Sequence, residues 1–235
     1  MSLSTAKTEQ PMTYSYKIIE KPVVWNKLSH WMWPEFDEKL FAVFDSVSDL
    51  DLVLHLVKNR KICVQAGGAV GVWPLRLSSE FDWVYTYEPH PQNFRCLMTN
   101  CFEVDNVIAQ NAAIGEKFGR ISLTLMDHEE NNHGAFQISE AAGLTGKVIP
   151  ITMIDALRLP ECGLIYLDIE GMEKHALTGA EETIKRCRPV IAVEDKGLSE
   201  IYGSHKGDLE NWLITEHNYR VVARPHRDVI LVPND

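Results

Sequence analysis

Residues suited to binding and deprotonating a small ligand follow several apolar runs of this sequence. Glycine permits a turn with positive φ and lets the backbone approach a ligand closely. Carboxylates accept hydrogen bonds and protons. Such residues follow the apolar runs 62–66, 83–87, 107–109, 164–167 and 189–193; they are Gly67, Gly68, Gly71, Glu88, Asn111, Asp168, Glu170, Glu194 and Asp195.

The stretch 61–91 has the order strand, glycine turn, helix, strand and acid, which is typical of the first half of a nucleotide-binding α/β unit. Glu88 ends the second strand, where a carboxylate can accept hydrogen bonds from both ribose hydroxyls. A dinucleotide fingerprint would place a glycine at position 66, which is Ala66. The pattern therefore fits any adenosine-containing cofactor, and the alternative is a glycine turn beside a surface glutamate.

The elements that must position these residues alternate between strands and helices. An apolar strand at 164–169 precedes one helix with Ala176, Leu177, Ala180 and Ile184 on one face. A strand at 147–154 contains Pro150, which favours an edge position. Strands at 219–223 and 229–232 form a terminal antiparallel hairpin. We therefore predict an α/β fold with a doubly wound, mostly parallel sheet, whose ligands lie beyond the carboxyl ends of the strands.

The N-terminal quarter differs in composition from the rest of the chain. Residues 1–13 are polar and are predicted to be disordered. Residues 14–58 are rich in aromatic side chains, with Trp25, Trp31 and Trp33 close together and helical spacing over 35–44. We expect an appendage over 1–58 and one ligand-binding domain over 59–235. The tryptophans either dock this appendage onto the core or form a cap over the site.

Composition and charge exclude several classes of protein. No apolar run reaches the ~18 residues of a membrane span, and the first 20 residues lack the apolar centre of a signal peptide. The five cysteines form no Cys-x-x-Cys pair, which argues against a disulfide scaffold or a zinc site. A net charge of −10 with only short basic patches argues against a nucleic-acid partner. We expect a cytoplasmic protein.

The loop 127–134 contains His128, Glu129, Glu130 and His133, which raises the question of a metal site. The two histidines are five residues apart, whereas zincins place them four apart on a helix. A plain solvated loop or a lid is the better interpretation, and no metal is predicted.

Five segments, in this order, resemble the FkbM family of class I methyltransferases, which depend on S-adenosylmethionine. They are VQAGGAVG (64–71), YTYEPHPQNF (85–94), NAAIG (111–115), LIYLDIEGMEKHALTGAEETI (164–184) and RPVIAVED (188–195). The resemblance implies a Rossmann-like sheet of seven strands that ends in the antiparallel hairpin. It also implies that S-adenosylmethionine contacts the glycine loop, that Glu88 binds its ribose and that the turn at Asn111 lies near its adenine. The cofactor-binding residues so implied are Gln65, Gly67, Gly68, Gly71, Glu88, Pro89, Asn93, Asn111, Ala112 and Asp168.

The glycine loop departs from the family pattern Val-Asp-x-Gly-Ala-Asn-x-Gly at two positions. Gln65 replaces the aspartate, so the charge that would offset a cationic cofactor is missing, and Ala69 replaces the asparagine. These two residues favour an alternative function, a degenerate cofactor-binding module that acts as an interaction protein. An adenosine- or dinucleotide-binding oxidoreductase is a third interpretation, which Ala66 and the segment 168–173 disfavour.

Our main prediction is a methyltransferase that methylates oxygen on a small molecule or sugar. Such an acceptor needs a base within hydrogen-bond reach, and the candidates are Asp168, then Glu170, then Glu194. Asp168 could instead cap the following helix or contact the methionine end of the cofactor. Glu170 could instead be an acid in the first turn of that helix, where it would interact with the helix dipole. Glu173 and His175 are expected on a solvated helix face. The expected partner is a small-molecule or glycan acceptor, with no membrane and no nucleic acid, and a homodimer is the one assembly that we consider.

Overall fold

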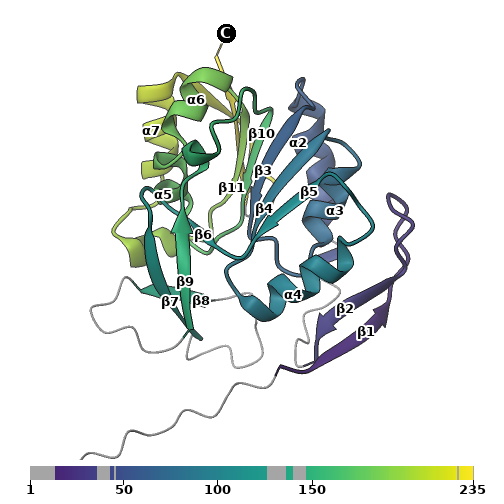
Figure 1. Cartoon of the computed structure of the whole chain (residues 1–235). Coiled ribbons are helices and arrows are strands. Elements are labelled where there is room, and N and C mark those ends of the chain that lie inside the picture. The colour runs from purple at the N-terminus through teal and green to yellow at the C-terminus, as the bar shows by residue number, and fades with distance from the viewer. Residues whose placement is uncertain are drawn as a thin grey trace, which may run out of the picture.

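A seven-stranded sheet forms the centre of the protein in a computed structural model that describes residues 14–35, 43–44, 46–125, 136–139, 147–226 and 228–234 (Figure 1). Its strand order is β12-β13-β11-β10-β3-β4-β5. The five strands from β11 to β5 are parallel, and β13 and β12 are antiparallel to their neighbours. The strands are β3 (Ile62–Ala66), β4 (Trp83–Tyr87), β5 (Val107–Gln110), β10 (Leu164–Leu167), β11 (Val190–Glu194), β12 (Tyr219–Ala223) and β13 (Asp228–Pro233). The predicted doubly wound sheet with a terminal hairpin is confirmed.

Helices cover both faces of this sheet, because its strands are apolar on both sides. Side chains alternate between two buried clusters along β3, where Cys63 belongs to one cluster and Val64 to the other. One cluster contains residues of α2 (Leu50–Leu56), α3 (Val72–Ser78) and α4 (Pro91–Asn100). The other contains residues of α5 (Glu173–Thr178), α6 (Glu181–Cys187) and α7 (Asp208–His217). Short 3-10 helices connect these layers: η1 (Val47–Asp49), η2 (Ile154–Leu157) and η3 (Leu198–Tyr202).

The prediction of a single helix after Asp168 is wrong, because the chain forms two helices, α5 and α6, at this place. A Cβ atom on Gly179, between them, would lie 2.1 Å from the carbonyl oxygen of Gly115. The carboxylate of Asp155 then accepts hydrogen bonds from the backbone N–H groups of Glu182 (2.9 Å) and Thr183 (2.8 Å). A side chain remote in sequence therefore satisfies the start of the second helix, which local periodicity cannot reveal.

A smaller, four-stranded sheet lies beside the carboxyl ends of the central strands (Figure 1). Its order is β6-β9-β7-β8, with β6 (Ala113–Ile114), β7 (Gly119–Leu125), β8 (Phe136–Ser139) and β9 (Lys147–Thr152). The edge position predicted from Pro150 is wrong, since β9 lies between β6 and β7. The proline is tolerated because β6 pairs only with Ile151 and Thr152, so that Pro150 has a paired neighbour on one side.

The aromatic-rich N-terminal segment begins as a β-hairpin, formed by β1 (Tyr16–Glu20) and β2 (His30–Pro34). Trp31 and Trp33 are 0% and 1% exposed, and Phe44 packs against both indole rings. These tryptophans belong to the same buried cluster as α2, α3 and α4, which agrees with docking. The helix predicted at 35–44 falls mostly outside the described residues, as does the tail 1–13. The domain boundary at residue 58 stays a prediction.

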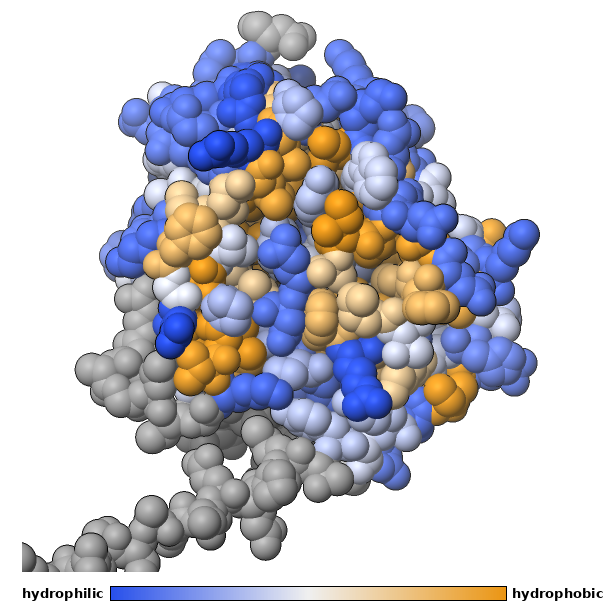
Figure 2. All heavy atoms as spheres, viewed as in Figure 1, coloured by the Kyte–Doolittle hydropathy of each residue, from blue (hydrophilic) through white to orange (hydrophobic). Residues whose placement is uncertain are grey.

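Hydrophilic residues form much of the margin of the face in Figure 2, and apolar atoms gather across its middle. No helix in the described ranges is long and apolar enough to cross a membrane.

Asn100 of α4 ties the hairpin to the core, which leads to a prediction. Its Oδ1 accepts a hydrogen bond from Met32 N (2.7 Å), and its Nδ2 donates to the carbonyl oxygens of Met32 (2.9 Å) and Val70 (2.7 Å). Asn100→Ala leaves these backbone groups without partners and should lower the free energy of unfolding by about 2–4 kcal/mol in a denaturant titration. The exposed Thr99→Ala on the same helix should change it by less than about 0.5 kcal/mol. Equal effects of the two changes would contradict this role.

Candidate functional site

The segment 67–71, the glycine loop, begins where β3 ends and leads into α3. The N–H groups of Gly67 and Gly68 both donate to the carbonyl oxygen of Tyr87, at 3.0 Å each, which holds the loop against β4. Gly67 has a φ of +84°, and a Cβ atom there would lie 1.9 Å from the carbonyl oxygen of Asp168. Gly71, with a φ of +101°, precedes α3. The loop therefore requires glycine at 67 for space as well as for conformation.

Glu88 lies directly beneath the glycine loop, at the end of β4. Its Oε2 accepts a hydrogen bond from Ala69 N and its Oε1 one from His90 N, both at 2.7 Å. The side chain is buried, and this burial raises its pKa from 4.5 to about 8, although the two N–H groups act in the opposite direction. Asp168 raises the pKa further. Glu88 thus braces the loop and also faces the adjacent cavity.

A cavity of about 530 Å³, part of it open to solvent, lies at the carboxyl ends of β3, β4 and β10. We call it the first cavity. The hydroxyl of Tyr87, a lining residue, is buried and has no hydrogen-bond partner in the described part of the chain. Of the residues predicted from the sequence to bind cofactor or act as the base, six line the cavity: Gly67, Glu88, Pro89, Ala112, Asp168 and Glu170. The remaining lining residues are Ala66, Tyr87, Ala113, Ile114, Leu123, Ile169 and Met172.

Five residues predicted to bind cofactor do not line the first cavity: Gln65, Gly68, Gly71, Asn93 and Asn111. Asn111 holds the cavity wall instead, since its Nδ2 donates to the carbonyl oxygens of Glu88 (2.8 Å) and Pro89 (3.0 Å). Asn93 is buried in the first turn of α4.

Gln65 is fully buried in β3 and interacts with the neighbouring strand rather than with the first cavity. Its Oε1 accepts a hydrogen bond from the hydroxyl of Thr86, and its Nε2 has no partner in the described part of the chain.

The loop after β10, residues 168–171, is held in an unusual conformation by Glu173. Glu170 and Gly171 both have positive φ, at +55° and +100°. Oε1 of Glu173 accepts hydrogen bonds from Ile169 N (3.0 Å) and Gly171 N (3.3 Å). The prediction that Glu173 lies on a solvated face is wrong, because it is 4% exposed, and burial raises its pKa to about 7. The repeated acids of the segment 168–173 were the only signal of this role.

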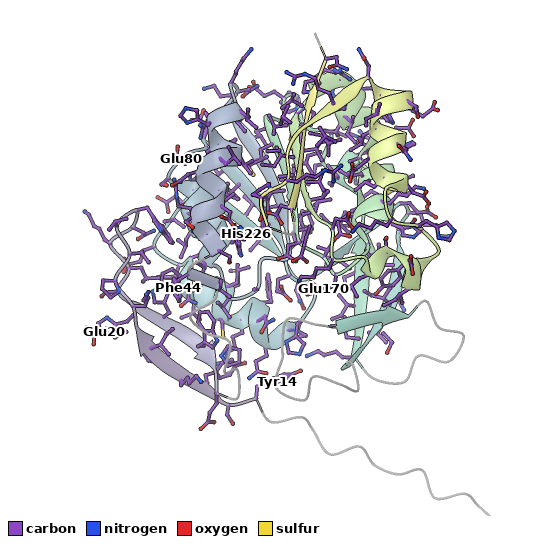
Figure 3. All side chains as sticks on the ribbon, turned by 180° about the vertical axis from the view of Figure 1, so that it is seen from behind. Tyr14, Glu20, Phe44, Glu80, Glu170 and His226 are labelled. Atoms are coloured by element: carbon purple, nitrogen blue, oxygen red, sulfur yellow. The ribbon has the colours of Figure 1, made fainter. Side chains whose placement is uncertain are left out.

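Three carboxylates from two strand ends converge to form what we call the acid cluster. Oxygen atoms of Asp168, Glu170 and Glu194 all lie within 4.8 Å of one another. Their convergence was expected from the sequence, because carboxyl ends of adjacent parallel strands meet at one edge of a sheet. Figure 3 shows Glu170 near the middle of the molecule, below the central strands.

Lys196, which sequence reasoning missed, lies among these carboxylates. Its Nζ is 2.6 Å from Glu194 Oε2, 3.3 Å from Glu170 Oε1 and 4.0 Å from Asp168 Oδ1. Burial opposes the charge of Lys196, but the three acids outweigh it and raise the pKa of the ammonium. The only sequence signal was a lysine two residues after Glu194, at the end of β11.

Partly buried carboxyl groups beside this lysine have strongly shifted pKa values. Burial, followed by the charge of Asp168, raises the pKa of Glu194 to about 9, and Lys196 acts against this shift. Burial also raises the pKa of Asp228 to about 6, although its hydrogen bond from the hydroxyl of Tyr166 (3.1 Å) lowers it. Asp228 pairs with Glu194 across β13 and β11 and was not predicted as part of the site. Perturbed acids of this kind are typical of functional sites.

A second cavity, of about 490 Å³ including space open to solvent, lies between the end of β11 and the segment 198–210. Glu194, Asp195 and Lys196 line it, whereas Asp168 and Glu170 line the first cavity. The contact between Lys196 and Glu170 therefore joins the walls of the two cavities.

The histidine-containing loop 127–134 falls outside the described residues. Among the residues that the structure describes, the acid cluster is the one group of His, Cys, Asp and Glu with the spacing of metal ligands. The sequence-based expectation that the protein uses no metal stays a prediction.

The buried carboxyl group of Glu88 predicts how the stability of the protein depends on pH. The pKa of Glu88 in the folded protein, about 8, exceeds its ordinary 4.5, so the folded chain keeps a proton that the unfolded chain loses between these values. The free energy of unfolding of the wild type should therefore fall, relative to Glu88→Gln, as pH rises from about 5 to about 8, by at most about 1.4 kcal/mol per pH unit. Denaturant titrations across this range measure the difference. The difference in free energy of unfolding between wild type and the exposed-site variant Glu103→Gln should not change with pH. A difference from Glu88→Gln that also stays constant would contradict the prediction.

Comparisons with known proteins identify the family. A model of the methyltransferase FkbM domain matches residues 69–221, more than half of the chain. No curated protein sequence matches the chain significantly.

Solved structures were also compared with this fold. Methyltransferase FkbM from Methylobacillus flagellatus KT is 19% identical, with a TM-score of 0.48, over 74% of this chain and 43% of that one. The chain thus spans less than half of that relative's length. Precorrin 8w decarboxylase from Methanobacterium thermoautotrophicum is 14% identical, with a TM-score of 0.46, over 80% of this chain and 90% of that one. TrmK from M. capricolum, in complex with S-adenosyl-homocysteine, is 11% identical, with a TM-score of 0.41, over 78% and 66%.

The family match, rather than these structural likenesses, decides the assignment, and it stands against the oxidoreductase interpretation. The chain belongs to the FkbM methyltransferase domain family.

Proposed function

We propose that the protein is a methyltransferase that transfers the methyl group of S-adenosylmethionine to an oxygen atom of a small molecule or sugar. The observation that carries this proposal is the first cavity, where Glu88, the glycine loop and Asp168 meet at the carboxyl ends of parallel strands. Ligands of doubly wound sheets bind at such edges. The family supports the cofactor, whereas oxygen as the methyl acceptor rests on the resemblance of the sequence and on the acids near the cavity.

The residues present fit S-adenosylmethionine. Glu88 has one hydrogen bond on each carboxylate oxygen, which leaves acceptor capacity for the hydroxyls of a ribose. The buried hydroxyl of Tyr87, without a partner in the described residues, is a second polar group that a ligand would satisfy. Apolar residues 112–114 would form the wall for an adenine, and Gly67 and Asp168 would hold the methionine end. When bound, the cofactor supplies an electrophilic methyl group on a cationic sulfur.

The chain itself must orient the acceptor and remove a proton from its hydroxyl. Asp168 and Glu170 line the first cavity, and Glu194 faces the second cavity a few ångströms away. A carboxylate whose pKa is raised is a stronger base than an ordinary one, provided that it is ionised. Because the pKa of Glu194 is about 9, its ionised fraction would increase as pH rises toward that value. The ammonium group of Lys196, 2.6 Å away, favours the ionised form. We therefore assign proton removal to the acid cluster.

A degenerate cofactor-binding module that serves as an interaction protein is the second candidate function. Its support comes from Gln65, whose carboxamide interacts with Thr86 and supplies no charge to the first cavity. Ala69, the second departure from the family pattern, contributes only its backbone N–H, which donates to Glu88. Four N–H groups of the glycine loop, those of Gly67, Gly68, Ala69 and Gly71, donate hydrogen bonds despite both replacements. We therefore expect any loss of cofactor binding to come from the missing charge rather than from a changed loop.

The remaining expectations concern partners and location. The net charge of −10 still argues against a nucleic-acid substrate. A cytoplasmic location, a small-molecule or glycan acceptor and a homodimer stay predictions that the composition and the family resemblance support.

Isothermal titration with S-adenosylmethionine and S-adenosylhomocysteine tests the cofactor. We expect wild-type dissociation constants on the order of 10 μM, weakened at least tenfold in Glu88→Ala because the ribose loses its acceptor and the glycine loop its brace. Tyr87→Phe should weaken binding less, and Glu103→Ala, an exposed glutamate, should have no effect. Absence of binding by folded wild type would favour the degenerate module.

The positions of Asp168 and Glu194 on different cavities predict different effects on turnover. Asp168→Asn should weaken cofactor binding as well as turnover, since Asp168 lines the first cavity. Glu194→Gln should lower kcat about 100-fold or more while the cofactor dissociation constant stays within about twofold. Single-turnover assays with an acceptor found by screening sugars and hydroxylated compounds, together with isothermal titration, separate the two effects. Indistinguishable losses in both variants would contradict this division.

A further inference from the structure

Lys196 forms contacts with all three carboxylates of the acid cluster. The distances from its Nζ are 2.6 Å to Glu194, 3.3 Å to Glu170 and 4.0 Å to Asp168, so its charge lies between side chains from the end of β11 and from the loop after β10. Two of these side chains are largely withdrawn from solvent, with 10% of Glu194 and 19% of Glu170 exposed, whereas 34% of Asp168 is exposed. Removal of one partner from such a partly buried ion pair leaves the other charge uncompensated and destabilises the site.

Without Lys196 the acid cluster would be a set of ligands for a divalent cation. Its carboxylate oxygens approach one another within 4.8 Å, and hard cations such as Ca²⁺, Mg²⁺ and Mn²⁺ prefer oxygen ligands. Three ionised carboxylates so close together repel each other, and either a proton on one of them or a positive charge among them relieves this repulsion. The ammonium group of Lys196 supplies this charge from the chain itself, at hydrogen-bond distance from two of the three.

In the described part of the chain, Lys196 is a cation that contacts all three carboxylates of the acid cluster. Lys174 also lines the second cavity, but it forms no ion pair with the acid cluster. Asp228, which faces the same edge of the sheet, adds a further acid and receives a hydrogen bond from Tyr166. Among the ion pairs of the described residues, Lys196 therefore supplies the positive charge shared by all three carboxylates.

We propose that Lys196 is the built-in cation of this site: it takes the place that a divalent metal ion would hold and fixes the acid cluster for metal-independent methyl transfer. In this role Lys196 is a positioning residue, which acts through Glu194 and Glu170. The inference rests on the proposed function for the reaction that the acid cluster serves. The replacement of a metal ion by Lys196 rests on the geometry alone.

The test is a gain of metal binding. Isothermal titration of Ca²⁺ and Mn²⁺ into wild type should give no measurable binding. Lys196→Ala and Lys196→Gln should bind these ions with an affinity at least tenfold above the detection limit, because the carboxylates that Lys196 contacted can then accept the ion. Lys196→Arg, which keeps the positive charge, should resemble wild type. Lys174→Ala is the matched control, since it removes a lysine from the same cavity without affecting the acid cluster. The double variant Lys196→Ala with Glu194→Gln should lose most of the gained affinity.

Thermal unfolding provides a second readout if the loss of Lys196 weakens the fold. Millimolar Ca²⁺ should raise the melting temperature of Lys196→Gln and leave that of wild type unchanged. The proposal is overturned if folded Lys196→Ala and Lys196→Gln gain no affinity for either ion, or if wild type binds the ions equally well. A parallel titration with S-adenosylmethionine keeps the outcomes separate, since failed cofactor binding by wild type would refute the proposed function while the metal titrations would still decide the role of Lys196.

Discussion

The site depends on the close approach of two backbone segments at the centre of the sheet. A Cβ atom on Gly67 would lie 1.9 Å from the carbonyl oxygen of Asp168, so the two segments can approach this closely only with glycine at position 67. The approach follows from the parallel pairing of β3 with β10, whose last residues Ala66 and Leu167 are in register. Because these two strands end together, the glycine loop and Asp168 form one wall of the first cavity. The register of the sheet thus determines where the residues that line the first cavity can lie.

Much of the fold could be predicted from the sequence because the positions of the strands and their burial follow from local patterns. The apolar runs before Gly67, Glu88, Asp168 and Glu194 are buried strands, and all four residues lie at one edge of the sheet. The break at Gly179 and the internal position of Pro150 could not be predicted in this way, because each depends on a partner far away in the chain. The β1–β2 hairpin was missed because its tryptophans fit helix, strand or loop equally well until their packing partners are known.

The roles of individual side chains were less predictable than their positions. Glu88 and Asp168 line the first cavity as expected, but Gln65 and Asn111 direct their amide groups to Thr86 and to backbone carbonyls. Residue type does not reveal such directions, since an amide can serve a ligand or the scaffold. Lys196 escaped notice for a related reason: two residues beyond a strand, a lysine usually points to solvent. Only the convergence of acids from separate strands explains why this one turns inward.

The buried acids impose a cost that the fold must offset elsewhere. Glu88, Glu173, Glu194 and Asp228 all have raised pKa values, with burial as the first cause in each case, so each is less easily ionised here than in water. A chain selected for stability alone would place few carboxyl groups in such surroundings. Backbone N–H groups compensate Glu88 and Glu173, which support loops, whereas Lys196 compensates Glu194. Fixed backbone donors hold Glu88 and Glu173 in place, whereas the acid cluster is balanced by one long side chain that can adjust when the charge beside it changes.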